Sequence, residues 1–275
     1  MLYFGQFLIK KILYINIGRL CESELMSSIY SNYSINNNFA IPRLGFKSNA
    51  GAYIPITSPV KDGYVTNPLY GDFGTAAEIE MTAKSNPRIR EILSEYDIPL
   101  KVNEKELEKL KNGHLLNTRI TSAKIYSNLP ADMKKEVNLT ELQDAAMFHD
   151  YGKVLIPESI LNKDSQLSDK EWAIMQQHSE IGAELLKNKN LPQRTLDLIK
   201  YHHNLKNAGY PKVNSDYQPG IDSEIIYTAD KYQALVEDRS YKKAMSPAEA
   251  LEIIQKDVQN GLISQDVFNA LKKSV

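Results

Sequence analysis

The spacing of apolar residues changes near residue 87. From there to the C-terminus, apolar positions recur at the three-to-four-residue spacing of amphipathic helices, as in PRIREILSEYDI, EKELEKLKNG and the run from His114 to Leu129. Residues 27–75 are instead rich in Asn, Ser, Gly and Pro and have no sustained period. The pattern predicts an all-α bundle over residues 87–275 and a poorly defined, irregular or disordered segment over residues 1–86. A small strand-rich unit around AGAYIPITSP is the alternative there, because Ile, Tyr and Thr favour strands.

Polar residues mark where several of these helices begin. Asn138 is followed three positions later by Glu141, and Ser168 by Glu171, which is the spacing of a capping box. Pro247 predicts another helix start, because the missing N–H of proline has no partner to lose in the first turn. These signals fix the helix boundaries more sharply than the apolar pattern does.

The first 20 residues contain two apolar runs that Lys10 and Lys11 separate, and each run is shorter than the ~20 residues of a membrane-spanning helix. We therefore expect no transmembrane segment. Arg19 directly before Leu20 and Cys21 does not suit a signal-peptide cleavage site. The segment is interpreted as a docking helix or as extra sequence upstream of a start at Met26. A single cysteine fits a reducing compartment and predicts a cytoplasmic location.

Charge is nearly balanced, with 33 Lys and Arg residues against 34 Asp and Glu residues. No global basic field favours DNA as a partner, so a bound anion must meet local positive charge. The charged amphipathic segment EKELEKLKNG could support a homodimer, although such helices are more often solvated on one face.

The candidate chemistry lies in the histidines, all five of which fall between residues 114 and 203. Taken singly, each is more often a surface or hydrogen-bonded residue than a ligand. Taken together with two aspartates, they are spread over separate predicted helices, and each helix can direct only one or two ligands to a point. The joint pattern favours a metal site built from seven candidate ligands: His114, His149, Asp150, His178, His202, His203 and Asp230.

Four segments, HDYGKVLIPESIL, HSEIGAELL, HHNLKNAGYP and ADKYQALVEDRSYKKAMSPAEAL, follow in the order of the motifs of an HD-GYP domain, which the chain resembles over residues 110–275. HD-GYP proteins belong to the HD metal-dependent phosphohydrolase superfamily. The resemblance implies an HD-type helical bundle and a cyclic dinucleotide phosphodiesterase that hydrolyses cyclic di-GMP to pGpG or GMP. It also implies two divalent metals that hold a hydroxide for attack. Iron or manganese is favoured for a His and carboxylate set without thiolates.

The same resemblance assigns roles to single residues. The seven candidate ligands match the family's metal positions, and Asp150 would contact both metals. Lys153 matches the family lysine that meets a substrate phosphate, and we take Asp150 and Lys153 as the catalytic pair. The predicted substrate-binding residues are Lys153, Tyr210, Gln233, Arg239 and Lys242. The alternatives for Lys153 and for the RSYKK run are solvated basic residues.

Departures from the family pattern qualify this assignment. Asn204 replaces the glutamate that usually follows the histidine pair, and the loop is one residue shorter. Gln233 replaces an aspartate, and Leu110 stands where some members have a glutamate associated with a third metal, so we predict two metals. The residues after His114 depart from the family pattern, so the match of His114 to a family metal position is the weakest of the seven. Two alternatives therefore remain: hydrolysis of another nucleotide, or a catalytically weak receptor for cyclic di-GMP.

Overall fold

The computed structural model describes residues 73–110, 113–206, 208–213, 217–238 and 243–275, all within one compact unit, Gly71–Val275. This unit is mostly helical, as the apolar spacing predicts. Its first helices are α2 (Ala76–Ser85), α3 (Pro87–Glu95) and α4 (Glu104–Leu110). Helix α2 lies within the segment 1–86 that was expected to be irregular, so the helical part begins at Ala76 rather than at Pro87.

Helix α2 forms because a capping box, not a long apolar pattern, defines its start. The Thr75 side chain accepts a hydrogen bond from the Glu78 backbone N–H, and the Glu78 carboxylate accepts one from the Thr75 backbone N–H. Its two buried residues, Ile79 and Ala83, are one turn apart and face the rest of the unit. A ten-residue helix that buries only two residues gives a weak periodic signal, which explains why the spacing alone does not predict this helix.

The central helices are α5 (His114–Asn128), α7 (Leu139–Phe148) and α12 (Ile221–Val236), and α5 packs against both of the others. Their shared core is fully buried, with Ile125, Leu142 and Ile225 among its members. Helix α11 (Gln193–Tyr201) packs against α7 and against α10 (His178–Leu186). The remaining elements are α6 (Ala131–Lys134), the 3-10 helix η1 (Tyr151–Leu155), α8 (Glu158–Leu161), α9 (Asp169–Gln176), α13 (Pro247–Gln259) and α14 (Gln265–Ser274).

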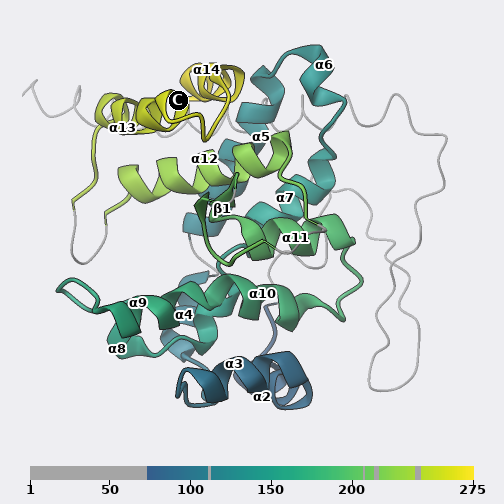
Figure 1. The fold of residues 1–275 in the computed structure, drawn as a ribbon, viewed down its shortest axis with the longest axis vertical. Helices are drawn as coiled ribbons and strands as arrows, with labels where there is room; N and C mark the ends of the chain where they lie inside the picture. The colour runs from purple at the N-terminus through teal and green to yellow at the C-terminus, as the bar shows by residue number, and fades with distance from the viewer. Residues whose placement is uncertain (1–72, 111–112, 207, 214–216, 239–242) are drawn as a thin grey trace, which may run out of the picture. The chain divides into compact units, whose positions relative to one another are not determined.

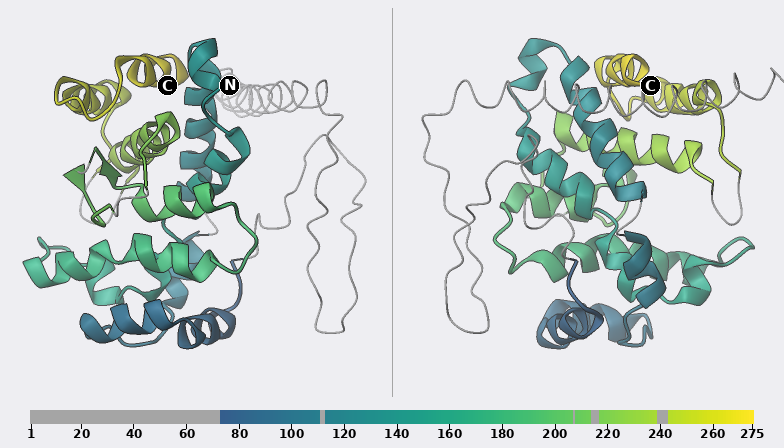
Figure 2. Two further views of the ribbon diagram at one scale, coloured as in Figure 1. Left: turned by 45° about the vertical axis from the view of Figure 1, so that its right-hand side comes forward. Right: turned by 180° about the vertical axis from the view of Figure 1, so that it is seen from behind.

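Figures 1 and 2 show how these helices are layered in the described unit. Helices α13 and α14 lie at one end, α2 and α3 lie at the other, and α10 and α11 cross between them. Strands β1 (Asn204–Leu205) and β2 (Ala208–Gly209) pair in an antiparallel hairpin, with Asn204 opposite Gly209. This hairpin is the only sheet among the described residues and lay outside the all-α prediction.

The predicted helix starts agree with the observed caps. The side chain of Asn138 accepts from the backbone N–H groups of Thr140 and Glu141, and Ser168 forms a capping box with Glu171. Ser246 caps α13, which begins at Pro247. None of the helices within the described ranges is long and apolar enough to cross a lipid bilayer.

A candidate metal site of histidines and aspartates

The candidate ligands lie at helix ends, where a side chain can turn toward a shared centre. His149 is the C-terminal cap of α7, Asp150 follows it before η1, and His202 is the C-terminal cap of α11. The sequence EWAIMQQHSEIGAELLK predicts one helix with His178 inside it. The structure instead divides this segment at Gln177, so that His178 is the first residue of α10.

Gly152 allows η1 to lie directly against α10. A Cβ atom on Gly152 would be 1.9 Å from the carbonyl oxygen of His178 and 2.5 Å from the backbone nitrogen of Gly182. Only a residue without a side chain permits this approach. The contact holds Asp150, two residues before Gly152, next to His178 at the start of α10.

Three of the histidines have their rings oriented in the same way. His149, His178 and His202 each donate their Nδ1–H to the backbone carbonyl three residues earlier, at 2.9, 2.7 and 2.7 Å. A carbonyl oxygen only accepts, so the proton of the neutral ring lies on Nδ1 and the lone pair lies on Nε2. Each ring therefore presents the lone pair of Nε2 to the centre, with its orientation fixed by the backbone, as in a ring that binds a metal.

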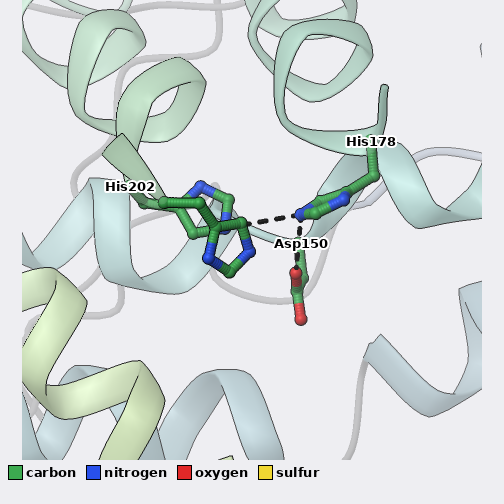
Figure 3. A group of neighbouring side chains, drawn as sticks. Asp150, His178 and His202 are labelled. Carbon is green, nitrogen blue, oxygen red and sulfur yellow. Dashed lines mark hydrogen bonds and ion pairs between the residues drawn. The ribbon is translucent and has the colours of Figure 1, made fainter. Parts of the chain in front are cut away.

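Asp150 lies between two groups of histidines. Its Oδ1 is 3.4 Å from Nε2 of His178, and its Oδ2 is 3.5 Å from Nε2 of His149 and 3.8 Å from Nε2 of His114. Figure 3 shows the Asp150 carboxylate and the imidazoles of His178 and His202 facing one another. The two oxygens of this carboxylate are thus directed to different sides of the centre.

Two sets of donor atoms each converge within 4.8 Å, and Asp150 belongs to both sets. The first set is Asp150, His178, His202 and His203, and the second is His114, His149 and Asp150. Asp230 lies beside the second set, with its Oδ1 3.3 Å from Nε2 of His114 and 3.5 Å from Nε2 of His149. All seven predicted ligands are therefore brought together.

The donor atoms are placed to bind a cation rather than to form hydrogen bonds with one another. Nε2 of His178 and Nε2 of His202 are 3.4 Å apart, although both carry lone pairs when Nδ1 is protonated. Nε2 of His149 is buried and has no hydrogen-bond partner among the described residues. Buried polar atoms are rarely left without partners in proteins. Divalent cations bound at the two donor sets would satisfy these nitrogens.

Burial keeps the inner histidines neutral. It lowers the pKa of His178 to about 3 and the pKa of His203 to about 4, and it holds the pKa of His202 well below its ordinary value. Neutral imidazoles are the form that binds metals.

The two aspartates are ionised in spite of burial. Burial raises the pKa of Asp150, but the adjacent positive charge of Lys153 opposes this effect, and the pKa lies well below the ordinary range. Burial also raises the pKa of Asp230, but its interactions with the His114 and His149 side chains outweigh burial and hold this pKa well below the ordinary range. Anionic carboxylates beside neutral imidazoles make a centre that attracts cations.

Lys153 contacts the same carboxylate that joins the two groups. Its Nζ is 2.6 Å from Oδ2 of Asp150, and its side chain is mostly buried. The ammonium group thus lies at the centre rather than in solvent, which argues against the alternative that Lys153 is a solvated helix-end residue.

His114 is oriented by a residue that the sequence analysis did not identify. Nδ1 of His114 is 2.7 Å from Oε2 of Glu237, and the Asn117 side chain donates to Oε1 of the same carboxylate at 3.0 Å. Burial lowers the pKa of His114, but the hydrogen bonds to Asp230 and Glu237 outweigh it and raise the pKa to about 9. The structure thus places His114 at the centre despite the unusual residues that follow it.

The hairpin after α11 brings Tyr210 to the centre. A Cβ atom on Gly209, whose φ is +136°, would lie 1.9 Å from the carbonyl oxygen of His203, so this position requires glycine. The ring of Tyr210 is 4.7 Å from the ring of His203. Asn204, which replaces the usual glutamate, donates from Nδ2 to the carbonyl oxygen of Pro211 at 2.5 Å and so closes the loop.

The HD domain family matches residues 101–267, which is more than half of the chain and includes every candidate ligand. The chain belongs to the HD domain family. The resemblance drawn from the motifs is therefore confirmed, and so is the expected HD-type helical fold.

The chain is similar to curated phosphodiesterases over about half of its own length. It is 35% identical over 141 residues to a cyclic di-GMP phosphodiesterase of Thermotoga maritima, covering 50% of this chain and 38% of that protein. It is 31% identical over 149 residues to one of Pseudomonas aeruginosa, covering 54% and 34%. It is 35% identical over 137 residues to a 3'3'-cGAMP-specific phosphodiesterase of Vibrio cholerae, covering 49% and 29%. The matched part of each relative is thus less than half of that relative.

Of the remaining predicted substrate-binding residues, the structure describes Gln233 but not Arg239 or Lys242. Gln233 is buried, and its Nε2 donates to the hydroxyl of Thr121 at 2.6 Å, which ties α12 to α5. Arg239 and Lys242 lie outside the described residues. Their roles in binding a substrate stay predictions.

Proposed function

We propose that this HD domain is a metal-dependent phosphodiesterase that hydrolyses a cyclic dinucleotide, with cyclic di-GMP as the leading substrate. The observation that carries the proposal is the position of Asp150. Its two carboxylate oxygens face separate groups of histidines, and Lys153 contacts one of those oxygens. The names of the cyclic di-GMP phosphodiesterases to which the chain is similar support the substrate class.

The ligand set fits two divalent metals, with iron or manganese favoured by imidazole and carboxylate donors without thiolates. One metal would be held by His178, His202 and His203. The other would be held by His114, His149 and Asp230, and Asp150 would contact both metals. When bound, such metals polarise a phosphoryl oxygen and activate water at neutral pH.

The protein itself contributes orientation and charge. The backbone carbonyls behind His149, His178 and His202 hold the three rings with Nε2 toward the centre, so the ligands need no reorientation. Lys153 supplies a positive point charge beside the centre, where negative charge develops on a phosphodiester during attack. Tyr210 adds an aromatic surface next to His203.

The test is a paired assay of the wild-type protein and Asp150→Ala. Both are purified, loaded anaerobically with iron or manganese, analysed for metal content and incubated with cyclic di-GMP. We expect the wild type to hold about two metals per chain and to release linear pGpG or GMP. Asp150→Ala should lose both the metals and the product. A wild type that holds less than about one metal per chain would overturn the mechanism.

A second candidate substrate is 3'3'-cGAMP. The similarity to 3'3'-cGAMP-specific phosphodiesterases of Vibrio cholerae favours it, and so does Gln233, which stands where an aspartate is usual and bonds within the protein. Comparing kcat/KM for cyclic di-GMP, 3'3'-cGAMP and cyclic di-AMP separates these substrates. Tight binding of cyclic di-GMP without turnover would instead favour a receptor.

A further inference from the structure

Trp172 is the single tryptophan of the chain, and it lies in α9, the helix that leads to His178. Its residue surface is 46% exposed. Scattered exposed apolar residues are ordinary on protein surfaces, so exposure alone assigns no role. The surroundings of the indole provide the second observation.

A series of aromatic rings connects this indole to the candidate metal centre. The ring of Trp172 is 5.8 Å from the ring of Tyr210 and nearly perpendicular to it, at 83°. The ring of Tyr210 is in turn 4.7 Å from that of His203 and 6.1 Å from that of His178. The indole thus lies two ring contacts from the nitrogen donors. An edge-to-face contact covers only part of an indole, so a planar group could still stack on it.

Helix α9 holds the indole in a fixed place. The capping box of Ser168 and Glu171 defines the first turn, and Lys163 contacts the Glu171 carboxylate at 2.6 and 2.8 Å. The carbonyl of Met175, one turn beyond Trp172, accepts the hydrogen bond from Nδ1 of His178. The same helix therefore orients one candidate ligand and carries the indole.

We propose that Trp172 forms, with Tyr210, the surface on which a nucleobase of the substrate stacks while its phosphodiester lies at the metal centre. This inference rests on the proposed function for the identity of the substrate. In a nucleotide, one sugar separates the base from the phosphate. With the phosphodiester at the metal centre, the base would therefore lie near the centre but outside it, where the aromatic surface of Trp172 and Tyr210 lies. Aromatic stacking tolerates different bases, so Trp172 contributes affinity for nucleobases in general, with purines favoured by their larger rings.

The first experiment uses the indole as its own reporter, because the full chain contains no other tryptophan. Metal-loaded protein is titrated with the non-hydrolysable phosphorothioate analogue of cyclic di-GMP, with ribose 5-phosphate as a base-free control. We expect saturable quenching of the emission by the analogue and none by ribose 5-phosphate. Equal responses to both ligands, or no response to the analogue, would overturn the proposal.

The second experiment compares Trp172→Phe with Trp172→Leu, since leucine keeps an apolar side chain but removes the π surface. Trp172→Leu should raise KM for cyclic di-GMP about 10-fold with little change in kcat, and Trp172→Phe should recover most of the loss. Met81→Ala removes another exposed apolar side chain, 62% exposed on α2, and should leave KM unchanged. Metal content and melting temperature are measured for each variant.

The outcomes separate this inference from the proposed function. Hydrolysis of cyclic di-GMP with an unchanged KM in Trp172→Leu would overturn the role of Trp172 and leave the function intact. Selective quenching without hydrolysis of any cyclic dinucleotide would support the stacking surface and overturn the proposed activity. A lower melting temperature with an unchanged KM would show that the indole only stabilises the fold.

Discussion

Replacing Gly152 with alanine tests whether the close approach of η1 to α10 sets the geometry of the candidate metal site. The new Cβ would start 1.9 Å from the His178 carbonyl oxygen, whereas real Cβ atoms essentially never lie closer than 3.0 Å to another heavy atom. The two backbones must therefore separate by about 1.1 Å, because both obstructing atoms belong to the main chain and cannot rotate away. Metal–ligand distances tolerate only about 0.2 Å. Oδ1 of Asp150 and Nε2 of His178, now 3.4 Å apart, could not both reach the same ion.

The expected result for Gly152→Ala is loss of the metal held by His178, together with lower stability. Overpacking of a well-packed interior costs about 1–3 kcal/mol, and for a unit of this size each kcal/mol lowers the melting temperature by about 2–4 °C. Metal analysis and thermal unfolding, with and without a chelator, measure both effects.

Gly261→Ala is the matched control for this substitution. Gly261 lies between α13 and α14, its φ is +68°, and a Cβ there would meet no atom within 4 Å. Backbone strain should lower its stability by about 1 kcal/mol without loss of metal. If Gly152→Ala binds metal and unfolds like the wild type, the close approach of η1 and α10 does not set the site.

Three further predictions follow from the charges and contacts at the centre. Lys153→Ala should keep the metals and lower kcat by about 10²–10³-fold, because it removes a charge that acts where negative charge develops; wild-type rates would show that Lys153 does not act in turnover. Glu237→Ala should weaken metal binding by about 10–100-fold, because the Glu237 carboxylate orients the candidate ligand His114 through the hydrogen bond at Nδ1 of His114. An unchanged affinity in a metal titration would refute this prediction. The metal-free protein should lose stability as the pH falls from about 6.5 toward 4. Burial lowers the pKa of His178 to about 3 and the pKa of His203 to about 4 in the folded protein. The unfolded chain therefore binds more protons than the folded chain in this pH range. Thermal unfolding in chelator at pH 7 and pH 5 measures this, and equal melting temperatures would contradict it.

Local signals in the sequence predicted much of the helical unit. Polar caps such as Asn138 and Ser168 act within one turn, so the sequence alone locates the helix starts that they stabilise. The histidines and aspartates were also predictable as a set, because the motif order assigned them to separate helix ends. Helix α2 was not predicted, since it buries only two residues and has little periodicity.

Contacts between distant segments were beyond the sequence analysis. Glu237 reaches His114 across 123 positions of the chain, and no local pattern marks it as an acceptor for an imidazole. The break at Gln177 was also missed, because the apolar spacing continues through it and its φ and ψ, −70° and −16°, stay in the right-handed helical region. Similarly, nothing near Trp172 in the sequence indicates that Tyr210 lies beside it.

The candidate ligands come from five separate segments of the chain, and this has a consequence for motion. The helices α5, α7, α10, α11 and α12 supply them from their ends or faces: His114, His149 with Asp150, His178, His202 with His203, and Asp230, in that order. Ions held among them would act as cross-links, so that none of these helices could open alone without first releasing a ligand. Backbone amides of α11 and α12 should then exchange with solvent at one common slow rate in the loaded protein. Helices α13 and α14, which carry no ligand, would retain their own faster rates.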